Sequence, residues 1–325
     1  MQYDVIAVDM FNLFYRKKNS SLEKDPISIA RNMVTFINNE VMQHLTDDGK
    51  LFLLYDPIPK TDLGLSKTFK YTERQEIVHA YKKNRTHDRN CLTVVDLVRK
   101  NFIHRGSNVI SVISDKYEAD DYMESIIKEN ENKDILMITN DEDYARYLSP
   151  KVVMMNTDNW LNLFTVDSFR DKYNFIPSIA GVCVWKACFG DGSDNIKGAL
   201  QAKGLRKAND VKLKAFEYVK YLGNNKDVTI EHIEKLKNAS HSELFKKKDK
   251  TVEEEFIYAI NMFDPKYEVT STFFNNLLVI QSRCDDYSKF ATAKDVDEKY
   301  NILIEKTLGF IKKEDRTFKF GMIKG

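Results

Sequence analysis

Near its amino terminus the chain reads Tyr3-Asp4-Val5-Ile6-Ala7-Val8-Asp9, a short apolar run that ends in a carboxylate. The pattern recurs where Leu51 to Tyr55 precedes Asp56, Val109 to Ile113 precedes Asp115, and Ile135 to Thr139 precedes Asp141. Short runs rich in Val, Ile and Leu are typical of buried strands in a parallel sheet. Since ligands lie at the carboxyl ends of such strands, we expect these acids at one edge of the sheet.

Helical patterns alternate with these strands, at residues 27–44, 66–85, 92–104 and 119–129. The alternation predicts an α/β fold over residues 1–165, with a central, mostly parallel sheet and flanking helices. After about residue 165 the strand signal fades and helical periodicity dominates. We therefore expect a second, mainly helical domain over residues 166–325.

The composition is that of a folded protein outside the membrane. Of 325 residues, 42% are hydrophobic and 30% are charged, a balance typical of globular chains. The longest apolar runs, Val152 to Met155 and Leu277 to Ile280, are far shorter than the ~20 residues that span a bilayer. The four cysteines are scattered and predict buried free thiols rather than a zinc site. We expect a cytoplasmic protein with no membrane partner.

Charge is distributed unevenly along the chain, although its net value is only +1. Residues 57–107 carry 11 Lys and Arg against 5 Asp and Glu, residues 108–161 carry 5 against 12, and residues 197–250 carry 14 against 7. Charge runs often form no more than solvated surfaces. An acidic centre between two basic segments also suits a site that holds cations together with a polyanion.

Further carboxylates stand at three expected turns. The motifs are Lys116-Tyr117-Glu118-Ala119-Asp120-Asp121, Thr139-Asn140-Asp141-Glu142-Asp143 and Gly190-Asp191-Gly192-Ser193-Asp194-Asn195-Ile196. Each alone is also typical of a helix cap or an Asx turn, and Asp120 joins Glu118 and Asp121 only if the turn is irregular. If all these acids converge, each carboxylate pair at about 4 Å repels by up to ~4 kcal/mol at an effective dielectric near 20. Such a cluster stays ionised only with cations among its members.

The expected ligands are all oxygens, which favours Mg²⁺ or Mn²⁺ over zinc. Mg²⁺ binds through few carboxylates and completes its coordination with water and phosphate oxygens. An acid-lined site therefore fits a phosphodiester substrate, and two-metal hydrolysis is the leading chemistry.

Together these motifs resemble the 5′ nuclease (flap endonuclease-like) superfamily, and most closely the ribonuclease H and 5′-3′ exonuclease of T4-like bacteriophages. That superfamily carries an acid after strand one, a Tyr-Lys-x-Asn-Arg helix, a Glu-Ala-(Asp/Asn)-Asp turn, an Asp-x-Asp turn and a Gly-Asp-x-x-Asp-Asn turn. This chain has them in the same order, as Asp9, Tyr81-Lys82-Lys83-Asn84-Arg85, Glu118-Ala119-Asp120-Asp121, Asp141-Glu142-Asp143 and Gly190-Asp191-Gly192-Ser193-Asp194-Asn195. The match spans residues 1 to about 200.

The resemblance implies a PIN/5′ nuclease-like fold that binds two Mg²⁺ ions, for which Mn²⁺ can substitute. One ion would lie among Asp9, Asp56, Glu118 and Asp120, and the other among Asp141, Asp143, Asp191 and Asp194, with Asp121 between or behind them. It also implies that the basic segment, about 57–107, forms an arch around a single-stranded 5′ end. Lys82 and Arg85 would then act at the scissile phosphate, because i and i+3 positions share one helix face.

Other basic residues are candidates for nucleic-acid binding: Arg16, Lys83, Lys203, Arg206 and Lys207. The last three follow Gly198 in a helix-three-turn-helix-like element, where relatives carry a Gly-x-Gly-x-(Lys/Arg) loop with a bound potassium ion. This chain keeps Gly198 and Gly204 but lacks the repeat, which puts potassium-dependent duplex binding in doubt. Cationic side chains still suit phosphate contacts.

The implied function is hydrolysis of phosphodiesters near the 5′ end of RNA or DNA strands in duplexes and flaps, including removal of RNA primers in phage replication. Implied partners are branched or nicked duplex DNA, RNA–DNA hybrids, a replication single-strand-binding protein and a sliding clamp, with the enzyme a monomer in the host cytoplasm. One alternative is an inactive protein of the same fold that only binds branched DNA. A haloacid-dehalogenase-type phosphatase is a weaker alternative, because Phe11 stands where that family needs a second aspartate.

Overall fold

The computed structural model describes residues 1–20, 25–57, 74, 78, 89–102, 108–114, 117–156, 162–201, 208–238, 244, 246–262 and 268–291. Several predicted residues fall outside these ranges: Lys82, Lys83, Arg85, Asp115, Lys203, Arg206 and Lys207. Most of the expected arch segment also lies outside them. The following account concerns the described residues.

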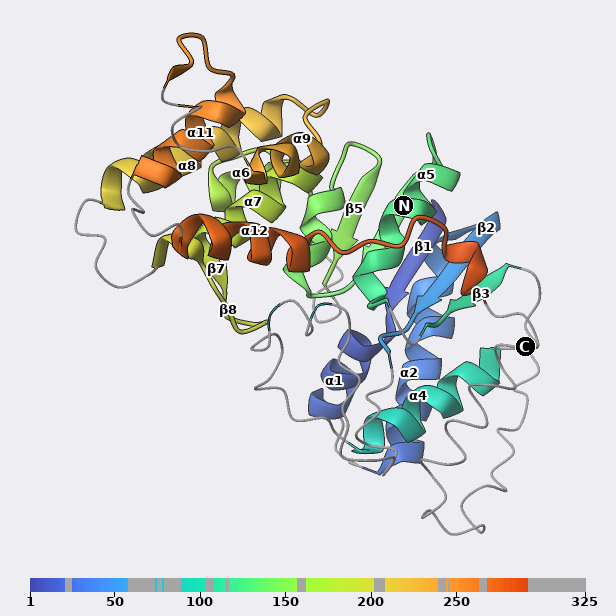
Figure 1. The fold of residues 1–325 in the computed structure, drawn as a ribbon. Helices are drawn as coiled ribbons and strands as arrows, with labels where there is room; N and C mark the ends of the chain where they lie inside the picture. The colour runs from blue at the N-terminus through green and yellow to red at the C-terminus, as the bar shows by residue number, and fades with distance from the viewer. Residues whose placement is uncertain are drawn as a thin grey trace.

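A six-stranded sheet forms the first part of the chain (Figure 1). Its strands are β1 (Tyr3–Asp9), β2 (Leu45–Leu54), β3 (Val109–Val112), β4 (Ile135–Ile138), β5 (Val152–Met155) and β6 (Leu163–Phe164). The spatial order is β3-β2-β1-β4-β5-β6, and only β6 runs antiparallel to its neighbour. The mostly parallel sheet predicted from the sequence is confirmed.

Alternating side chains of the strands pack into two hydrophobic clusters on opposite faces of the sheet. Ile6 and Val8 pack with helices α1 (Met10–Ser20), α2 (Pro26–Phe36) and α4 (Arg89–Phe102). Val5 and Ala7 pack on the other face with the short helix η4 (Ala119–Tyr122), α5 (Met123–Glu129), η5 (Glu142–Tyr147) and helices of the second half. Because helices cover both faces of the sheet, every residue of β1 except Asp4 is buried.

Local structure departs from the sequence prediction in two places. The helix expected over residues 27–44 begins at Pro26, capped by the Asp25 carboxylate, but after Phe36 it continues as a π-turn (η1, Ile37–Val41) and a 3-10 turn (η2, Met42–His44). Strand β2 also begins at Leu45, six residues before the apolar run. Its polar first half carries exposed side chains, which is why hydrophobic periodicity missed it.

The second half is helical, as predicted. It contains α6 (Val166–Tyr173), α7 (Ile179–Phe189), α8 (Ala208–Asn224), α9 (Ile230–Glu234), α11 (Val252–Met262) and α12 (Glu268–Ile280), with short helices η6 (Ala199–Gln201), η7 (Lys235–Asn238) and η8 (Tyr287–Lys289). A hairpin of β7 (Gly190–Asp191) and β8 (Ile196–Lys197) follows α7, which packs against α8 and α12. All four cysteines are buried and unbonded to one another, as expected.

After α12 the chain returns to the sheet (Figure 1). Ala291 bridges Val112 at the end of β3, and the Ile113 amide donates to the Phe290 carbonyl at 3.0 Å. We call residues 281–291 the return segment. It links the helical half directly to the strands and passes the turn at Asp121, whose carbonyl accepts from the Cys284 amide at 2.8 Å. Among the described residues, no helix is long and apolar enough to cross a membrane.

Candidate metal centre

The strand order reverses direction between β1 and β4, and this is where ligands bind in open parallel sheets. Asp9 ends β1, and Asp141 lies three residues after the end of β4. The Asp9 carboxylate accepts hydrogen bonds from the Asn12 amide at 2.9 Å and from the Thr139 hydroxyl at 3.3 Å. Thr139 Oγ1 also accepts from the Asp141 amide at 3.0 Å. These contacts tie the carboxyl ends of the two strands together.

Four carboxylates meet at this point, and we call Asp9, Asp56, Asp120 and Asp141 the first acidic group. Burial raises the pKa of Asp9 well above its ordinary value, and the charges of the other three raise it further. Asp56 joins the group because its carboxylate accepts the Ala119 amide at 2.8 Å, at the start of η4. Asp56, Asp120 and Asp141 thus lie near enough to Asp9 to raise its pKa, although these four are not among the described carboxylates that bring one oxygen each within 4.8 Å of one another.

The hydroxyl of Tyr144 lies behind the first acidic group. Burial raises the pKa of Tyr144, and the four carboxylates of the group raise it further. The hydroxyl oxygen is buried and has no hydrogen-bond partner among the described residues. Buried polar atoms normally have a protein or water partner. Clustered carboxylates beside an unsatisfied hydroxyl fit a divalent cation and its coordinated water.

Arg74 holds the carboxylates of the turn that begins at Glu118. Its Nη1 lies 2.9 Å from Glu118 Oε2 and its Nη2 lies 3.3 Å from Asp120 Oδ2, with a further contact to Asp121 Oδ1. Glu118 caps η4, and this 3-10 turn is the irregular geometry that allows all three acids to reach one guanidinium. All four side chains are buried.

Asp121 lies behind the other acids. One of its oxygens contacts Arg74, and the other accepts from the Glu118 amide at 2.8 Å and from the Ser282 hydroxyl at 3.2 Å. Burial raises the pKa of Asp121 to about 6, although Arg74 acts in the opposite direction. Since both oxygens are engaged within the protein, Asp121 supports the turn rather than presenting a free ligand atom.

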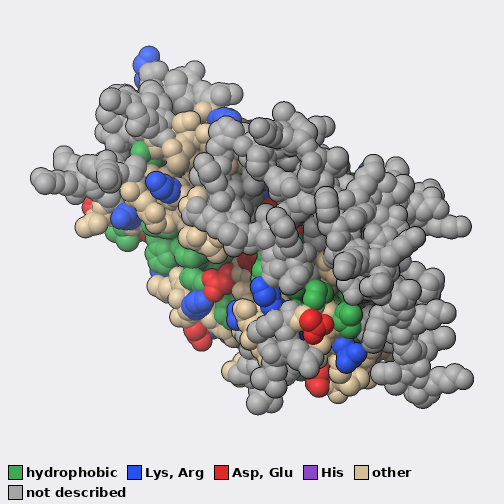
Figure 2. Space-filling view, turned by 90° about the horizontal axis from the view of Figure 1, so that it is seen from below, with side chains coloured by type: hydrophobic (Ala, Val, Ile, Leu, Met, Phe, Trp, Pro, Cys, Tyr) green, Lys and Arg blue, Asp and Glu red, His purple; other side chains and the backbone are tan. Residues whose placement is uncertain are grey.

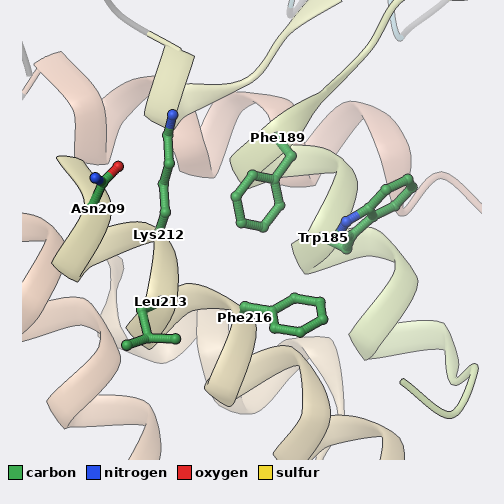
Figure 3. Close-up of a pocket in the computed structure, with 6 residues that line it drawn as sticks. All are labelled: Trp185, Phe189, Asn209, Lys212, Leu213 and Phe216. Atoms are coloured by element: carbon green, nitrogen blue, oxygen red, sulfur yellow. The ribbon is translucent and has the colours of Figure 1, made fainter. Parts of the chain in front are cut away.

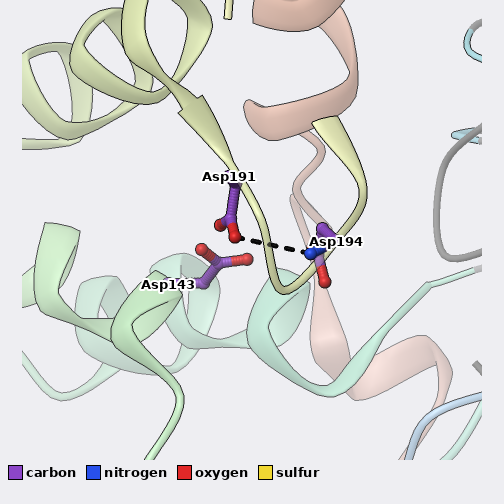
Figure 4. Close-up of side chains that lie close together, drawn as sticks. All are labelled: Asp143, Asp191 and Asp194. Carbon is purple, nitrogen blue, oxygen red and sulfur yellow. Dashed lines mark hydrogen bonds between the residues drawn. The ribbon is translucent and has the colours of Figure 1, made fainter. Parts of the chain in front are cut away.

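A second acidic group consists of Asp143, Asp191 and Asp194 (Figure 4). One carboxylate oxygen from each lies within 4.8 Å of those of the other two. Asp143 comes from η5, whereas Asp191 and Asp194 come from the β7–β8 hairpin and its turn. Three oxygen donors at this spacing match the ligand type that Mg²⁺ and Mn²⁺ prefer.

Lys186 lies against this second group. Its Nζ is 2.6 Å from Asp191 Oδ2 and also contacts Asp143 Oδ1. Burial acts against ionisation of Asp191, but the contact with Lys186 and hydrogen bonds from Ser193 outweigh it, so the pKa of Asp191 lies below its ordinary value. The carboxylate is therefore ionised at neutral pH, with one oxygen in contact with Lys186 and the other accepting from Ser193, contacts that a bound cation would replace.

Two glycines allow the hairpin to close. Gly190 has φ +90°, and a Cβ atom there would lie 2.6 Å from the Gly198 nitrogen. At Gly198 a Cβ atom would lie 2.3 Å from the Phe189 carbonyl carbon. The two stems of the hairpin therefore touch backbone to backbone, which fixes where Asp191 and Asp194 stand.

The two groups are neighbours in space. The Asp141 carboxylate accepts the Asp143 amide at 3.0 Å, so one turn supplies a member of each group. Arg146, from the same short helix, contacts Asp120 at 2.9 Å and donates to the Ile280 carbonyl at 2.6 Å. Seen from below, some acidic and basic side chains of the described residues lie next to each other at the surface (Figure 2).

Sequence reasoning missed the three side-chain cations at the centre, Arg74, Arg146 and Lys186. The sequence predicted cations among the carboxylates, and these three side chains supply part of that positive charge. Lys186 carried a signal: it is the one charged residue of α7, and a buried lysine needs an acidic partner. Nothing in the local sequence distinguished Arg74 from its polar neighbours.

Of the basic residues predicted to act on the nucleic acid, the structure describes Arg16 alone. Arg16 is exposed on α1, and the other basic candidates fall outside the described residues. A surface pocket between α7 and α8 is lined by Trp185, Phe189, Asn209, Lys212, Leu213 and Phe216 (Figure 3). None of these six residues belongs to either acidic group, so this pocket is separate from the candidate metal centre.

Comparisons with known proteins identify a family and a shared fold. Residues 7–174, more than half of the chain, match the family described as 5′-3′ exonuclease, N-terminal resolvase-like domain. A mutant of the bacteriophage T5 5′-exonuclease shares 17% identity and a TM-score of 0.53, covering 94% of this chain and 100% of its own. No curated protein matches the chain.

Two further bacteriophage T5 structures are similar. The T5 5′-exonuclease with bound zinc ions has 19% identity and a TM-score of 0.54, covering 93% of this chain and 99% of its own. The T5 D15 flap endonuclease in a complex with DNA and metal ions has 19% identity and a TM-score of 0.52, with 93% and 98% covered. At these identities the likeness shows a shared fold.

Proposed function

This chain belongs to the family of 5′-3′ exonucleases that share an N-terminal resolvase-like domain, and from that membership we propose that it is a divalent-metal-dependent 5′ nuclease. The resemblance to the 5′ nuclease superfamily seen in the sequence is thereby confirmed. The proposed reaction is hydrolysis of phosphodiester bonds near the 5′ end of a strand in a duplex or flap. The observation that carries the proposal is the meeting of two acidic groups at the carboxyl edge of the sheet.

The residues present fit two divalent cations. Asp9, Asp56, Asp120 and Asp141 would hold one, and Asp143, Asp191 and Asp194 the other. The first set has a buried carboxyl, that of Asp9, whose pKa is raised mainly by burial and further by the neighbouring carboxylates. When bound, such ions lower the pKa of an attacking water and stabilise the departing oxygen of a phosphodiester. The T5 relatives have been crystallised with metal ions, which supports metal binding here.

Two acidic residues in contact with Arg74 are not assigned as metal ligands. Glu118 and Asp121 are bound to its guanidinium, so we assign them to holding the turn that carries Asp120. Arg74 and Arg146 both contact Asp120 and fix its position from two sides. A preorganised set of charges costs no rearrangement when the substrate arrives, which is the main source of electrostatic catalysis.

The nucleic acid would be bound by basic residues outside the acidic groups. We propose that Lys82 and Arg85 neutralise charge on the scissile phosphate and that Lys83 and Arg16 contact neighbouring phosphates. Lys203, Arg206 and Lys207, which follow the hairpin carrying Asp191, would bind the duplex as point charges. This division agrees with the alternation of basic and acidic segments along the chain.

We further propose that the substrates include RNA–DNA hybrids and that the biological task is removal of RNA primers in phage DNA replication, with a single-strand-binding protein and a sliding clamp as partners. The support is the resemblance of the five ordered motifs to the T4-like ribonucleases H. Digestion of matched RNA-primed and all-DNA duplexes tests this part separately. An RNA primer that survives while the DNA flap is cut would remove the ribonuclease assignment and leave the nuclease assignment intact.

The nuclease itself is tested with a 5′-labelled flap in Mg²⁺ and in EDTA. We expect short 5′ products from the parent protein in Mg²⁺ only, and a loss of more than 100-fold in rate for Asp141→Ala and for Asp191→Ala. If either variant cuts as fast as the parent, the proposed metal groups are wrong. Tight flap binding without product at any metal concentration would instead indicate an inactive branched-DNA-binding protein.

A further inference from the structure

Asn276 lies in the middle of α12, far along the chain from every residue of the acidic groups. Its side chain is only 4% exposed. One amide nitrogen, Nδ2, donates to two backbone carbonyls, that of Ala187 at 3.2 Å and that of Lys197 at 2.8 Å. A single buried amide group thus joins three elements: α12, the last turn of α7 and β8.

The two carbonyls flank the metal-binding hairpin. Ala187 belongs to the last turn of α7, where carbonyl groups lack a partner within the helix. Lys197 is the last residue of β8, paired with Gly190 at the start of β7. The chain therefore enters the hairpin just after the first carbonyl and leaves it at the second. Asp191 and Asp194 lie between these two anchored points.

The strands of the hairpin are short, although Lys186 also contacts Asp191 and the side chain of Ile196 is buried in the core. Its ladder contains two residue pairs, Gly190 with Lys197 and Asp191 with Ile196, and its turn residues Gly192 and Ser193 are exposed. Short, two-stranded hairpins are marginally stable in water on their own. A buried donor that binds the end of α7 before the hairpin and the last residue of β8 at once is therefore in a position to determine where the turn lies relative to Asp143.

We propose that Asn276 is a positioning residue for the second acidic group: through the two stem carbonyls it holds Asp191 and Asp194 at the distance from Asp143 that a divalent cation requires. The inference rests on the proposed function, because it assigns the cation to this group. Residues that orient metal ligands from behind typically change metal affinity by about 10- to 100-fold when removed.

The test compares Asn276→Leu with Asn261→Leu. Asn261 is also buried, at 6% exposure, on the neighbouring helix α11, and its side-chain oxygen accepts from the Thr270 hydroxyl at 2.6 Å. It is a matched control, because the same substitution removes a buried amide at the α11–α12 contact without touching the hairpin. Asn276→Asp, equal in size but unable to donate, serves if the leucine variant does not fold.

Two measurements are made on the full chain. Mn²⁺ titration followed by electron paramagnetic resonance counts the bound ions and their affinities, with Asp191→Asn marking loss of the second ion. Hydrogen exchange without metal reports the amides of residues 190–197. We expect the Asn276 variant to bind the second ion, the one lost in Asp191→Asn, at least tenfold less tightly than the parent. Its amides at residues 190–197 should exchange about tenfold faster. Both values should be unchanged in Asn261→Leu.

The outcomes separate the two hypotheses. If the parent binds no Mn²⁺, the proposed function fails, and the positioning role for metal fails with it, whatever the exchange data show. If the parent binds two ions and the Asn276 and Asn261 variants have equal affinities and equal exchange rates, the proposed function stands and the inference about Asn276 is overturned.

Discussion

The guanidinium of Arg74 lies 2.9 Å from the carboxylate of Glu118, although 44 residues separate them in the chain. Both side chains are almost fully buried, at 4% and 5% exposure. The same guanidinium contacts Asp120 and Asp121, so one cation balances three carboxylates. The turn that carries Asp120 into the first acidic group therefore depends on a residue of the segment between β2 and α4.

Replacing Arg74 with methionine should destabilise the protein, because three buried carboxylates lose their shared cation. Removal of one partner from a buried ion pair costs about 3–5 kcal/mol. We expect a loss of that size in the free energy of unfolding in EDTA, and a smaller loss in excess Mg²⁺. Urea unfolding followed by circular dichroism measures both.

The control for this change is Arg283→Met. Arg283 is partly exposed and contacts Glu231 at the surface, where an ion pair contributes at most about 1 kcal/mol. Equal urea midpoints for the Arg74 variant and the parent in EDTA would show that the buried ion pairs do not stabilise the turn.

Lys186→Met should lower the melting temperature of the protein in EDTA and raise its affinity for a divalent cation. Without the ammonium group, Asp143 and Asp191 repel each other, so the melting temperature in EDTA should fall. The same site is then more negative and should bind a divalent cation more tightly, since a ligand that binds only the folded state stabilises it. Differential scanning calorimetry with and without Mg²⁺ should show a larger upward shift for the variant than for the parent. An identical shift in both proteins would contradict a cation site at Asp143 and Asp191.

The hairpin glycines offer a matched pair of substitutions. A Cβ atom at Gly198 would meet three backbone atoms of residues 188–190 within 2.5 Å, whereas one at Gly192 would meet nothing within 4 Å. Gly198→Ala must therefore displace the stems that carry Asp191 and Asp194. Since a shift of about 1 Å can cost 100-fold in rate, we expect flap cleavage to fall by about that factor. The Gly192→Ala protein should cleave the flap at the parental rate. If both variants cleave the flap equally fast, the position of the hairpin does not determine the rate of cleavage.

Reversing the charges of Lys203, Arg206 and Lys207 tests the proposed duplex path. The logarithm of duplex affinity should fall with the logarithm of salt concentration at a slope of about −0.9 per phosphate neutralised. The variant should show a shallower slope, while its turnover on short single strands stays unchanged. Fluorescence anisotropy over a series of salt concentrations gives the slope. A slope equal to that of the parent would exclude these residues from the duplex path.

The sequence predicted the parts of this protein that depend on local pattern. The runs before Asp9, Asp56 and Asp141 are buried strands, and their parallel pairing follows from the helices between them. The first half of β2 was not predicted, since its exposed polar residues lack an apolar pattern. Strand β5, Val152–Met155, was not predicted as a strand either, because it was considered only as an apolar run too short to cross a membrane. Its partner β6 contains two residues, too few to show any period.

The acidic members of the centre were proposed because their motifs stand in the same order as those of the 5′ nuclease superfamily. Their counterions could not. Arg74 and Asp120 come together only through packing of distant segments, and the contact of Arg146 with the Ile280 carbonyl depends on where α12 ends. Long-range partners of this kind leave no periodic signal in a single sequence. Lys186 is the exception, because a lone lysine in an apolar helix indicates a buried acid nearby.

The central claim is that both acidic groups bind divalent cations. Crystals of the parent protein soaked in Mn²⁺ test it most directly, because anomalous scattering locates each ion. The account predicts one peak among Asp9, Asp56, Asp120 and Asp141 and a second among Asp143, Asp191 and Asp194. Crystals that diffract well, contain millimolar Mn²⁺ and show no anomalous peak at either group would contradict it.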